Sequence, residues 1–413
     1  MEAQNPAVAL FLALGIIIAA SRVAGAVARR FGQPRVLGEL VIGVILGPTL
    51  LDMLHWPIFH GIELEVTVFE LAELGVLLLM FLVGLEVNLK ELARVGRIAA
   101  VAGTAGALLP VLITLPLLLV FNYAWPPALF AGVTLAATSV SISAQVLLEL
   151  GHLRTKEGNA LLATALIDDV LAILLVSLAT ALVATGGEAD GGALFGIMVG
   201  MTAYIAIAFL IAWYGIPRLI DWIADQPYLA QSAGIAASAL VIMLVFAWTA
   251  EELGGVATIT GAFIAGVGFS RAREHLRHMI EESASAIAYA FLVPIFFVDV
   301  GLQADLSAFP LSALPLALLL LVIAIVSKVG GCGLGALWTG FNRQESLRLG
   351  VCMISRGEVG LIIASLGLAA GVFRSDDPLF ASLFFVILLT TVVTPILVRM
   401  VFPRRAEHAR EAG

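Results

Sequence analysis

The sequence contains few charged residues. Lys, Arg, Asp and Glu make up 13% of the 413 residues, whereas 61% are hydrophobic, and the mean hydropathy is +1.06. Soluble domains usually have about 25% charged and about 45–50% apolar residues. A soluble fold would leave much of this apolar surface in water, so the composition excludes a soluble protein and indicates a polytopic membrane protein.

Other features that are scarce or absent exclude further classes. The two cysteines, Cys332 and Cys352, lie in or beside apolar runs, so they imply no disulfide framework. No basic region precedes the first apolar run and no clear cleavage site is present, so we expect a retained helix rather than a signal peptide. Because no Walker-type glycine loop occurs, an ATP-driven pump is disfavoured, and we expect neither a nucleotide nor a cofactor. The basic residues are spread over short loops, so we expect no nucleic-acid partner.

Long apolar stretches occupy most of the chain. A spanning helix needs about 20 mostly apolar residues. The candidate spans cover roughly residues 7–28, 36–51, 68–89, 97–121, 128–150, 159–185, 192–214, 229–250, 256–270, 285–302, 310–338, 346–371 and 379–402. We therefore predict an all-α membrane protein with 13 transmembrane helices in contact with the lipid bilayer.

The basic residues indicate the orientation of these spans. If the N-terminus is outside, the inward loops and the C-terminal tail hold 18 of the 22 Lys and Arg residues, and the outward loops hold only Arg374. Cytoplasmic loops of membrane proteins carry an excess of Lys and Arg. We expect a multi-pass protein of the cell (inner) membrane, with its N-terminus outside and its C-terminus in the cytoplasm.

Two sequence patterns recur at an offset of seven spans. The third span ends in VGLEVNL (83–89) and the tenth in VGLQADL (300–306); the second contains GELVIGV (38–44) and the ninth GAFIAGV (261–267). Because seven is odd, the second copy would enter the membrane from the opposite side, as in the inverted repeats of many secondary transporters. Chance similarity between glycine-rich helices is the alternative. The repeats would cover about 36–185 and 256–402, with 192–250 as a linker.

The fifth and twelfth spans correspond under this repeat, and polar residues interrupt both. The fifth contains Thr138 and Ser139, and the twelfth contains Ser355-Arg356-Gly357-Glu358. Interrupted helices at corresponding positions indicate a transporter's binding site, because unwound backbone frees carbonyl groups for cations. Ordinary packing of small residues between helices is the other interpretation of the hydroxyl groups.

Two adjacent carboxylates, Asp168 and Asp169, lie in the middle of the sixth span. A charge at the bilayer centre costs about 3 kcal/mol on insertion scales, so an intramembrane acid pair is a functional-site hypothesis. Lys328 lies deep in the eleventh span and needs an acidic partner to stay charged. Adjacent residues on a helix point about 100° apart, so one aspartate can pair with the lysine while the other faces the ion path. The spacing allows either assignment.

These groups predict coupled transport. Neighbouring carboxylates raise the pKa of one of them, and a cation can then compete with the proton for the same acid. A site that accepts either H⁺ or a small cation, exposed alternately to the two sides, gives antiport. Arg356 and Glu358 are two residues apart, so they do not face each other on a helix, and each is expected to pair across the crossing helices or to belong to a structural charge network.

Seven segments together resemble the bacterial sodium/proton antiporters of the monovalent cation:proton antiporter superfamily. They are GELVIGVILGP (38–48), LAELGVLLLMFLVGLE (71–86), ATSVSISAQVLLELG (137–151), ALIDDVLAI (165–173), LVPIFFVDVGL (292–302), SKVGGCGLGA (327–336) and MISRGEVGLIIASLGL (353–368). The Asp-Asp pair followed by a lysine five spans later is most similar to the NapA-like, electrogenic branch. Asp299 departs from the pattern, where an apolar or small residue is expected.

The resemblance implies a homodimer with a dimerisation domain and a core domain that moves like an elevator. It implies that Asp169 binds the cation or proton, that Asp168 pairs with Lys328, and that Thr138 and Ser139 lie in the first unwound crossing helix. Arg356 and Glu358 would lie in the second. Compared with the glutathione-gated potassium efflux relatives, the sequence is expected to lack the soluble regulatory domain.

The leading hypothesis is therefore exchange of protons for Na⁺, and for Li⁺ as well. K⁺/H⁺ exchange is an alternative, because the motif does not fix the ion size. A cation channel or sensor on the same scaffold is a further alternative, although the sequence shows no filter-like loop.

Overall fold

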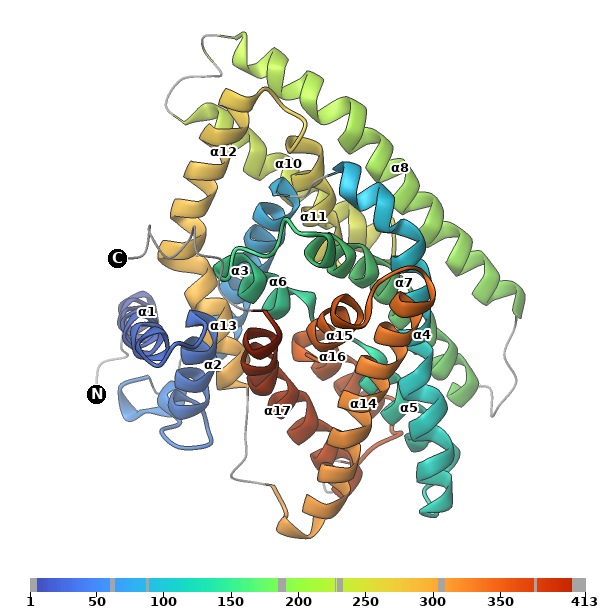
Figure 1. Ribbon diagram of the computed structural model, residues 1–413. Coiled ribbons are helices and arrows are strands. Elements are labelled where there is room, and N and C mark those ends of the chain that lie inside the picture. Colours follow the sequence, from blue (N-terminus) through green and yellow to red (C-terminus); the bar gives the residue numbers. More distant parts are fainter. Residues whose placement is uncertain are drawn as a thin grey trace. The chain divides into compact units, whose positions relative to one another are not determined.

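A computed structural model describes residues 6–59, 64–86, 89–184, 191–226, 228, 233–303, 309–374 and 377–402. Within these ranges the regular secondary structure is helical throughout (Figure 1). The chain divides into two compact units, and each contains segments from both halves of the sequence. Unit 1 comprises Met1–Val87 and Met201–Ser307, and unit 2 comprises Asn88–Gly200 and Ala308–Gly413.

Unit 1 is built from helices that precede and follow unit 2's first segment. They are α1 (Pro6–Arg30), α2 (Arg35–Leu46), α3 (Leu64–Leu85), most of α8 (Gly191–Ala224), α10 (Gly234–Glu252), α11 (Thr258–Phe269), α12 (Glu274–Ile287) and α13 (Val293–Leu302). Helix α2 packs against α1 and α13, and α3 packs against α11 and α13 (Figure 1).

Unit 2 contains the sequence segments in which the site is predicted. Its helices are α4 (Leu89–Val120), α5 (Trp125–Ala136), α6 (Val140–Glu149), α7 (Lys156–Ala184), α14 (Leu314–Trp338), α15 (Arg343–Cys352), α16 (Gly357–Ala369) and α17 (Pro378–Val401). The long helix α4 packs against α5, α7 and α14. A core of small and aliphatic side chains from α4, α5, α7, α14, α16 and α17, together with Phe130 and Phe373, holds this unit together.

Ten helical segments in the described ranges are long and apolar enough to cross a membrane. Three of the 13 expected spans are not among them. Those three fall on the short helices α2 and α11 and on the pair α15 and α16, which a break separates. The composition therefore identified the apolar segments, whereas helix length alone does not establish that all 13 cross.

The expected tenth span, 285–302, is longer in the structure. Helix α12 continues through a π-helical turn (Ala288–Leu292) into α13, so one helical segment runs from Glu274 to Leu302. The N–H of Val293 donates to the carbonyl of Ala288, and Pro294, which has no N–H, follows. A proline removes a helix hydrogen bond, and a π-turn absorbs the misfit without ending the helix.

Close helix contacts in unit 1 depend on two pairs of glycines. A Cβ at Gly43 of α2 would lie 2.2 Å from a carbonyl oxygen of α13, and one at Gly301 of α13 would lie 2.5 Å from a carbonyl oxygen of α2. Gly84 of α3 and Gly266 of α11 have the same relation, with distances of 2.3 and 2.1 Å. Small residues let helix backbones approach closely, so no larger side chain fits at these four positions.

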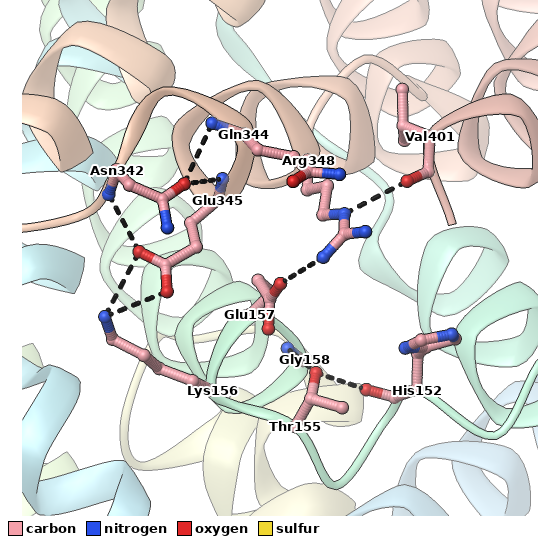
Figure 2. Close-up of polar contacts among 10 residues, drawn as sticks. All are labelled: His152, Thr155, Lys156, Glu157, Gly158, Asn342, Gln344, Glu345, Arg348 and Val401. Carbon is pink, nitrogen blue, oxygen red and sulfur yellow. Dashed lines mark hydrogen bonds and ion pairs between the residues drawn. The ribbon is translucent and has the colours of Figure 1, made fainter. Parts of the chain in front are cut away.

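A polar network joins the beginning of α7 to α15 in unit 2 (Figure 2). Glu157 Oε1 lies 2.8 Å from a guanidinium nitrogen of Arg348, whose Nε also donates to the carbonyl of Val401 at 3.0 Å. The neighbouring Lys156 lies 3.2 Å from Glu345, and Glu345 in turn caps α15 through a capping box with Asn342. The network fixes α7, which carries the aspartate pair, against α15, the helix that precedes the break before α16.

This network predicts different effects for two adjacent residues of α7. The Glu157 and Arg348 side chains are 12% and 18% exposed, whereas Lys156 is 41% exposed. Hydrogen bonds to charged groups contribute about 1.5–3 kcal/mol, whereas exposed pairs contribute about 0–1 kcal/mol. We expect E157Q to lower the melting temperature of the purified protein clearly more than K156A does. Equal shifts for the two variants would contradict this ranking.

Candidate functional site

Two helix breaks in unit 2 meet each other. Helix α5 ends at Ala136 and α6 begins at Val140, while α15 ends at Cys352 and α16 begins at Gly357. The N–H of Ser139 donates to the carbonyl of Ser355 at 2.9 Å, and the Ser355 hydroxyl donates to the carbonyl of Ser139 at 2.5 Å. The breaks expected from the sequence are present, and each satisfies backbone groups of the other.

Further contacts hold the second break in place. The Ser143 hydroxyl on α6 donates to the carbonyl of Cys352 at 2.6 Å, and the Thr391 hydroxyl on α17 accepts from the N–H of Gly357 at 3.2 Å. Gly357 has a φ of +44°, and a Cβ there would lie 2.6 Å from the Cβ of Ser139. Both the backbone conformation and the close approach of the first break therefore require glycine at this position.

The two hydroxyl groups predicted as ligands differ in their surroundings. Ser139 Oγ lies 3.0 Å from Ser141 Oγ, so it is already hydrogen-bonded within the first break. Thr138 is 3% exposed, and its Oγ1 has no hydrogen-bond partner in the described part of the chain. A buried hydroxyl without a partner costs free energy unless it meets a ligand. Thr138 is therefore available to coordinate a cation.

Asp168 and Lys328 form an ion pair inside unit 2. Lys328 Nζ on α14 donates to Asp168 Oδ1 on α7 at 2.7 Å, and the two side chains are 0% and 1% exposed. Breaking such a pair by removing one partner leaves an uncompensated buried charge. The sequence spacing left the lysine's partner open, and the structure places Asp168 in that position.

Asp169 follows Asp168 on α7 but is only partly buried. Successive helix positions differ by about 100°, so Asp169 projects in another direction than its lysine-paired neighbour. A carboxylate, a threonine hydroxyl and unwound backbone carbonyls are all hard oxygen ligands, which suit an alkali cation. Groups of three or more His, Cys, Asp or Glu side chains, as a resident metal would need, do not occur among the described residues.

Arg356 lies at the end of the second break and is completely buried. It was expected to pair across the crossing helices. Its hydrogen-bond partners in the described residues are carbonyl oxygens, its Nε has none there, and the negative charge of Asp168 on α7 acts on it. Its guanidinium donates to Ala324 of α14 at 2.8 Å, and to Met353 and Ile354, which follow α15. A cation at a helix C-terminus satisfies carbonyls that the helix leaves unpaired. Glu358 lies on α16, but its side chain is outside the described residues.

Asp299, the departure from the family pattern, lies on α13 in unit 1. It is 6% exposed, and its Oδ2 accepts a hydrogen bond from Gln303 one turn later at 2.6 Å. The residues predicted for ion binding, in contrast, all belong to unit 2.

Sequence reasoning assigned no role to several residues that hold the breaks. Ser143 and Ser355 were recognisable as polar residues in apolar spans, but their partners were not. The carbonyl of Ala324 and the hydroxyl of Thr391 carry no signal in the sequence, because their roles depend on which helix packs against the break.

Comparisons with known proteins identify the family to which the chain belongs. Residues 15–403 match the family model described as sodium/hydrogen exchanger, transmembrane. The Na⁺/H⁺-K⁺ antiporter GerN of Bacillus cereus is 36% identical over 392 residues, which cover 95% of this chain and 96% of that protein. A Na⁺/H⁺ antiporter of Enterococcus hirae is 34% identical over 386 residues, covering 94% and 96%.

The fold is also similar to a solved structure. The sodium proton antiporter MjNhaP1 from Methanocaldococcus jannaschii at pH 8 superposes with a TM-score of 0.67 at 16% identity, covering 97% of this chain and 99% of that one. At this identity the likeness concerns the fold. The family model and the two relatives show that the chain belongs to the sodium/hydrogen exchanger family of transmembrane proteins.

Proposed function

We propose that this chain is a secondary antiporter that exchanges protons for a monovalent cation, Na⁺ and also Li⁺, across the cell membrane. The observation that carries the proposal is the position of Asp169. It is a partly buried carboxylate beside a lysine-paired aspartate, in the unit where two helix breaks meet. The names of the relatives, which are antiporters and not enzymes, support the same class of function.

Asp169 is the group that binds either the proton or the cation. The Thr138 hydroxyl and the unwound backbone beside it supply further oxygen ligands, while Ser139 fastens the first break to Ser355. Proton and cation exclude each other, because a protonated carboxyl group loses the charge that attracts Na⁺. Exchange follows if the loaded site, but not the empty ionised one, can pass from one side of the membrane to the other.

Asp168 serves as the partner of Lys328 rather than as the main cation ligand. Its Oδ1 is engaged by the lysine at 2.7 Å, and the pair is buried. Arg356 fixes the second break to α14, and Glu358 lies on the half-helix that follows. The combination of an Asp-Asp pair with a buried lysine supports assignment to the NapA-like, electrogenic branch.

The proposed movement is an elevator motion of unit 2 relative to a dimer formed through unit 1. The division of the chain supports it, because every proposed ion-site residue belongs to unit 2 and none to unit 1. We also propose 13 spans, with the N-terminus outside, and inverted repeats over about 36–185 and 256–402.

Glycine contacts in unit 1 support the repeats. Under the proposed correspondence α2 matches α11 and α3 matches α13. The contact of Gly43 with Gly301 then corresponds to the contact of Gly266 with Gly84. In both pairs, a Cβ atom added to one glycine would lie about 3 Å from the Cα atom of the other. Exchanging the two repeats therefore converts one glycine contact into the other, as expected for helices that are related by a pseudo-two-fold axis.

K⁺/H⁺ exchange is the second candidate, because the relative GerN is named a Na⁺/H⁺-K⁺ antiporter. A channel or sensor on the same scaffold is disfavoured, since the sequence has no filter-like loop. Titration of Na⁺, Li⁺ and K⁺ in turn in proteoliposomes distinguishes the first two. A channel would conduct the cation without moving protons in return.

Replacing the proposed ion ligand tests the site. We expect D169N to abolish cation-driven proton movement in proteoliposomes, because an amide offers no charge to either ion, while the melting temperature stays near that of the parent. D52N, the same change in an exposed loop residue, is the matched control. Na⁺-dependent proton movement retained in D169N would refute the assignment.

Competition between proton and cation predicts a specific pH dependence. Lowering the pH protonates Asp169, so the Na⁺ concentration for half-maximal exchange should rise as the pH falls. For one proton the rise approaches about tenfold per pH unit over the range in which the carboxylate titrates. A half-maximal concentration that does not change with pH would contradict a shared site.

Electrogenic exchange predicts that a membrane potential alters the rate. We expect a K⁺/valinomycin diffusion potential of either sign to change the initial rate of Na⁺/H⁺ exchange in opposite directions. Equal rates at both signs would exclude the electrogenic branch but would leave antiport itself intact.

A further inference from the structure

The second carboxylate oxygen of Asp168 lies in an unusual environment. Lys328 binds Oδ1, but Oδ2 is buried and has no hydrogen-bond partner among the described residues. An ionised carboxylate oxygen normally accepts several hydrogen bonds, and leaving one unpaired away from water is costly. The geometry of the pair therefore leaves one strong acceptor to be satisfied.

A second unpaired group lies one helical turn away. Thr164, four residues before Asp168 on α7, is 0% exposed, and its Oγ1 also has no partner in the described part of the chain. Other threonines in these helices donate to the carbonyl four residues back: Thr134 at 2.8 Å, Thr180 at 2.9 Å and Thr390 at 2.8 Å. Thr164 departs from this pattern although it has the same helical setting as Thr180.

Helix geometry brings the two unpaired groups together. Residues four apart lie on one face, with Cβ atoms about 5–6 Å apart. Side chains lean toward the helix N-terminus, so the Asp168 carboxyl group leans over the turn that carries Thr164. The two atoms do not bond each other directly, since each has no hydrogen-bond partner among the described residues, and a single molecule between them can bind both.

Helix α4 covers this turn closely. A Cβ at Gly103 would lie 3.1 Å from the carbonyl oxygen of Thr164, and one at Gly106 would lie 3.8 Å from the Lys328 side chain. The glycines bring the α4 backbone against the pair and separate it from lipid. The bridging molecule would be an internal one.

We infer that α7 binds a buried water molecule between the Thr164 hydroxyl and Asp168 Oδ2. Buried waters occur where otherwise unsatisfied polar groups converge, and they are costly to remove. Water can donate to the carboxylate and accept from the hydroxyl, so it satisfies both groups. Asp168 then has both oxygens engaged, by lysine and by water, which leaves Asp169 as the carboxylate for the transported ion. Only this last consequence rests on the proposed function.

The sign of a stability change tests the water site. T164V removes the hydroxyl and keeps the shape. If no water contacted the hydroxyl, its removal would eliminate the free-energy cost of an unpaired buried group, and the stability would be unchanged or higher. If the hydroxyl binds a water molecule that is hydrogen-bonded to Asp168, T164V leaves the carboxylate oxygen without a partner and lowers the melting temperature. We expect a lower melting temperature for T164V and a smaller change for T164S, which keeps the hydroxyl.

T180V is the matched control on the same helix, because the Thr180 hydroxyl is satisfied by a carbonyl. A T164V melting temperature equal to or above that of T180V would overturn the proposal. The T164V effect should persist in the D169N background, where exchange is expected to be absent, so failure of the proposed function would not be mistaken for failure of the water site.

An experimental structure of the parent protein at a resolution that shows ordered water provides a second measurement, which does not depend on the variants folding. Density for one water within hydrogen-bond distance of both Thr164 Oγ1 and Asp168 Oδ2 would support the inference. A direct hydrogen bond between the two side chains, or a Thr164 hydroxyl turned to its own helix carbonyl, would overturn it.

Discussion

The candidate site depends on the buried ion pair between Asp168 and Lys328. Two charges removed from water are stable only when they meet at short range, here 2.7 Å. The pair fixes α7 against α14, and Arg356 reaches the same helix α14 through the carbonyl of Ala324. Helix α14 is thus the common support of the aspartate pair and of the second break, and the position of Asp169 follows from it.

The two breaks form a second constraint. Non-helical backbone at membrane depth must find partners within the protein, because lipid offers none. Ser139 and Ser355 supply these partners reciprocally, and the hydroxyl of Ser143 adds another from α6. The unwound segments are therefore held by specific hydrogen bonds, and the unpaired hydroxyl of Thr138 stands out against them.

The sequence predicted much of the fold. Apolar stretches located the helices because burial in lipid requires them, and polar residues inside those stretches located both breaks. Helix ends were less predictable: α12 was expected to be a loop before residue 285, but the π-turn before Pro294 lets the helix continue. The carbonyl partners of Arg356 were also missed, because every residue has a backbone carbonyl and the sequence does not indicate which one accepts a hydrogen bond from a side chain.

The sequence by itself determined that the protein lies in a membrane, that charged residues fall within its apolar spans, and that Asp168 and Asp169 are adjacent in one of these spans. Composition and spacing are enough for this, since each follows from the cost of placing charge in lipid. Only the tertiary structure decided which aspartate meets Lys328. The two carboxylates are one residue and about 100° apart on α7, and the packing of a helix 160 residues away in sequence sets which of these directions points to the lysine.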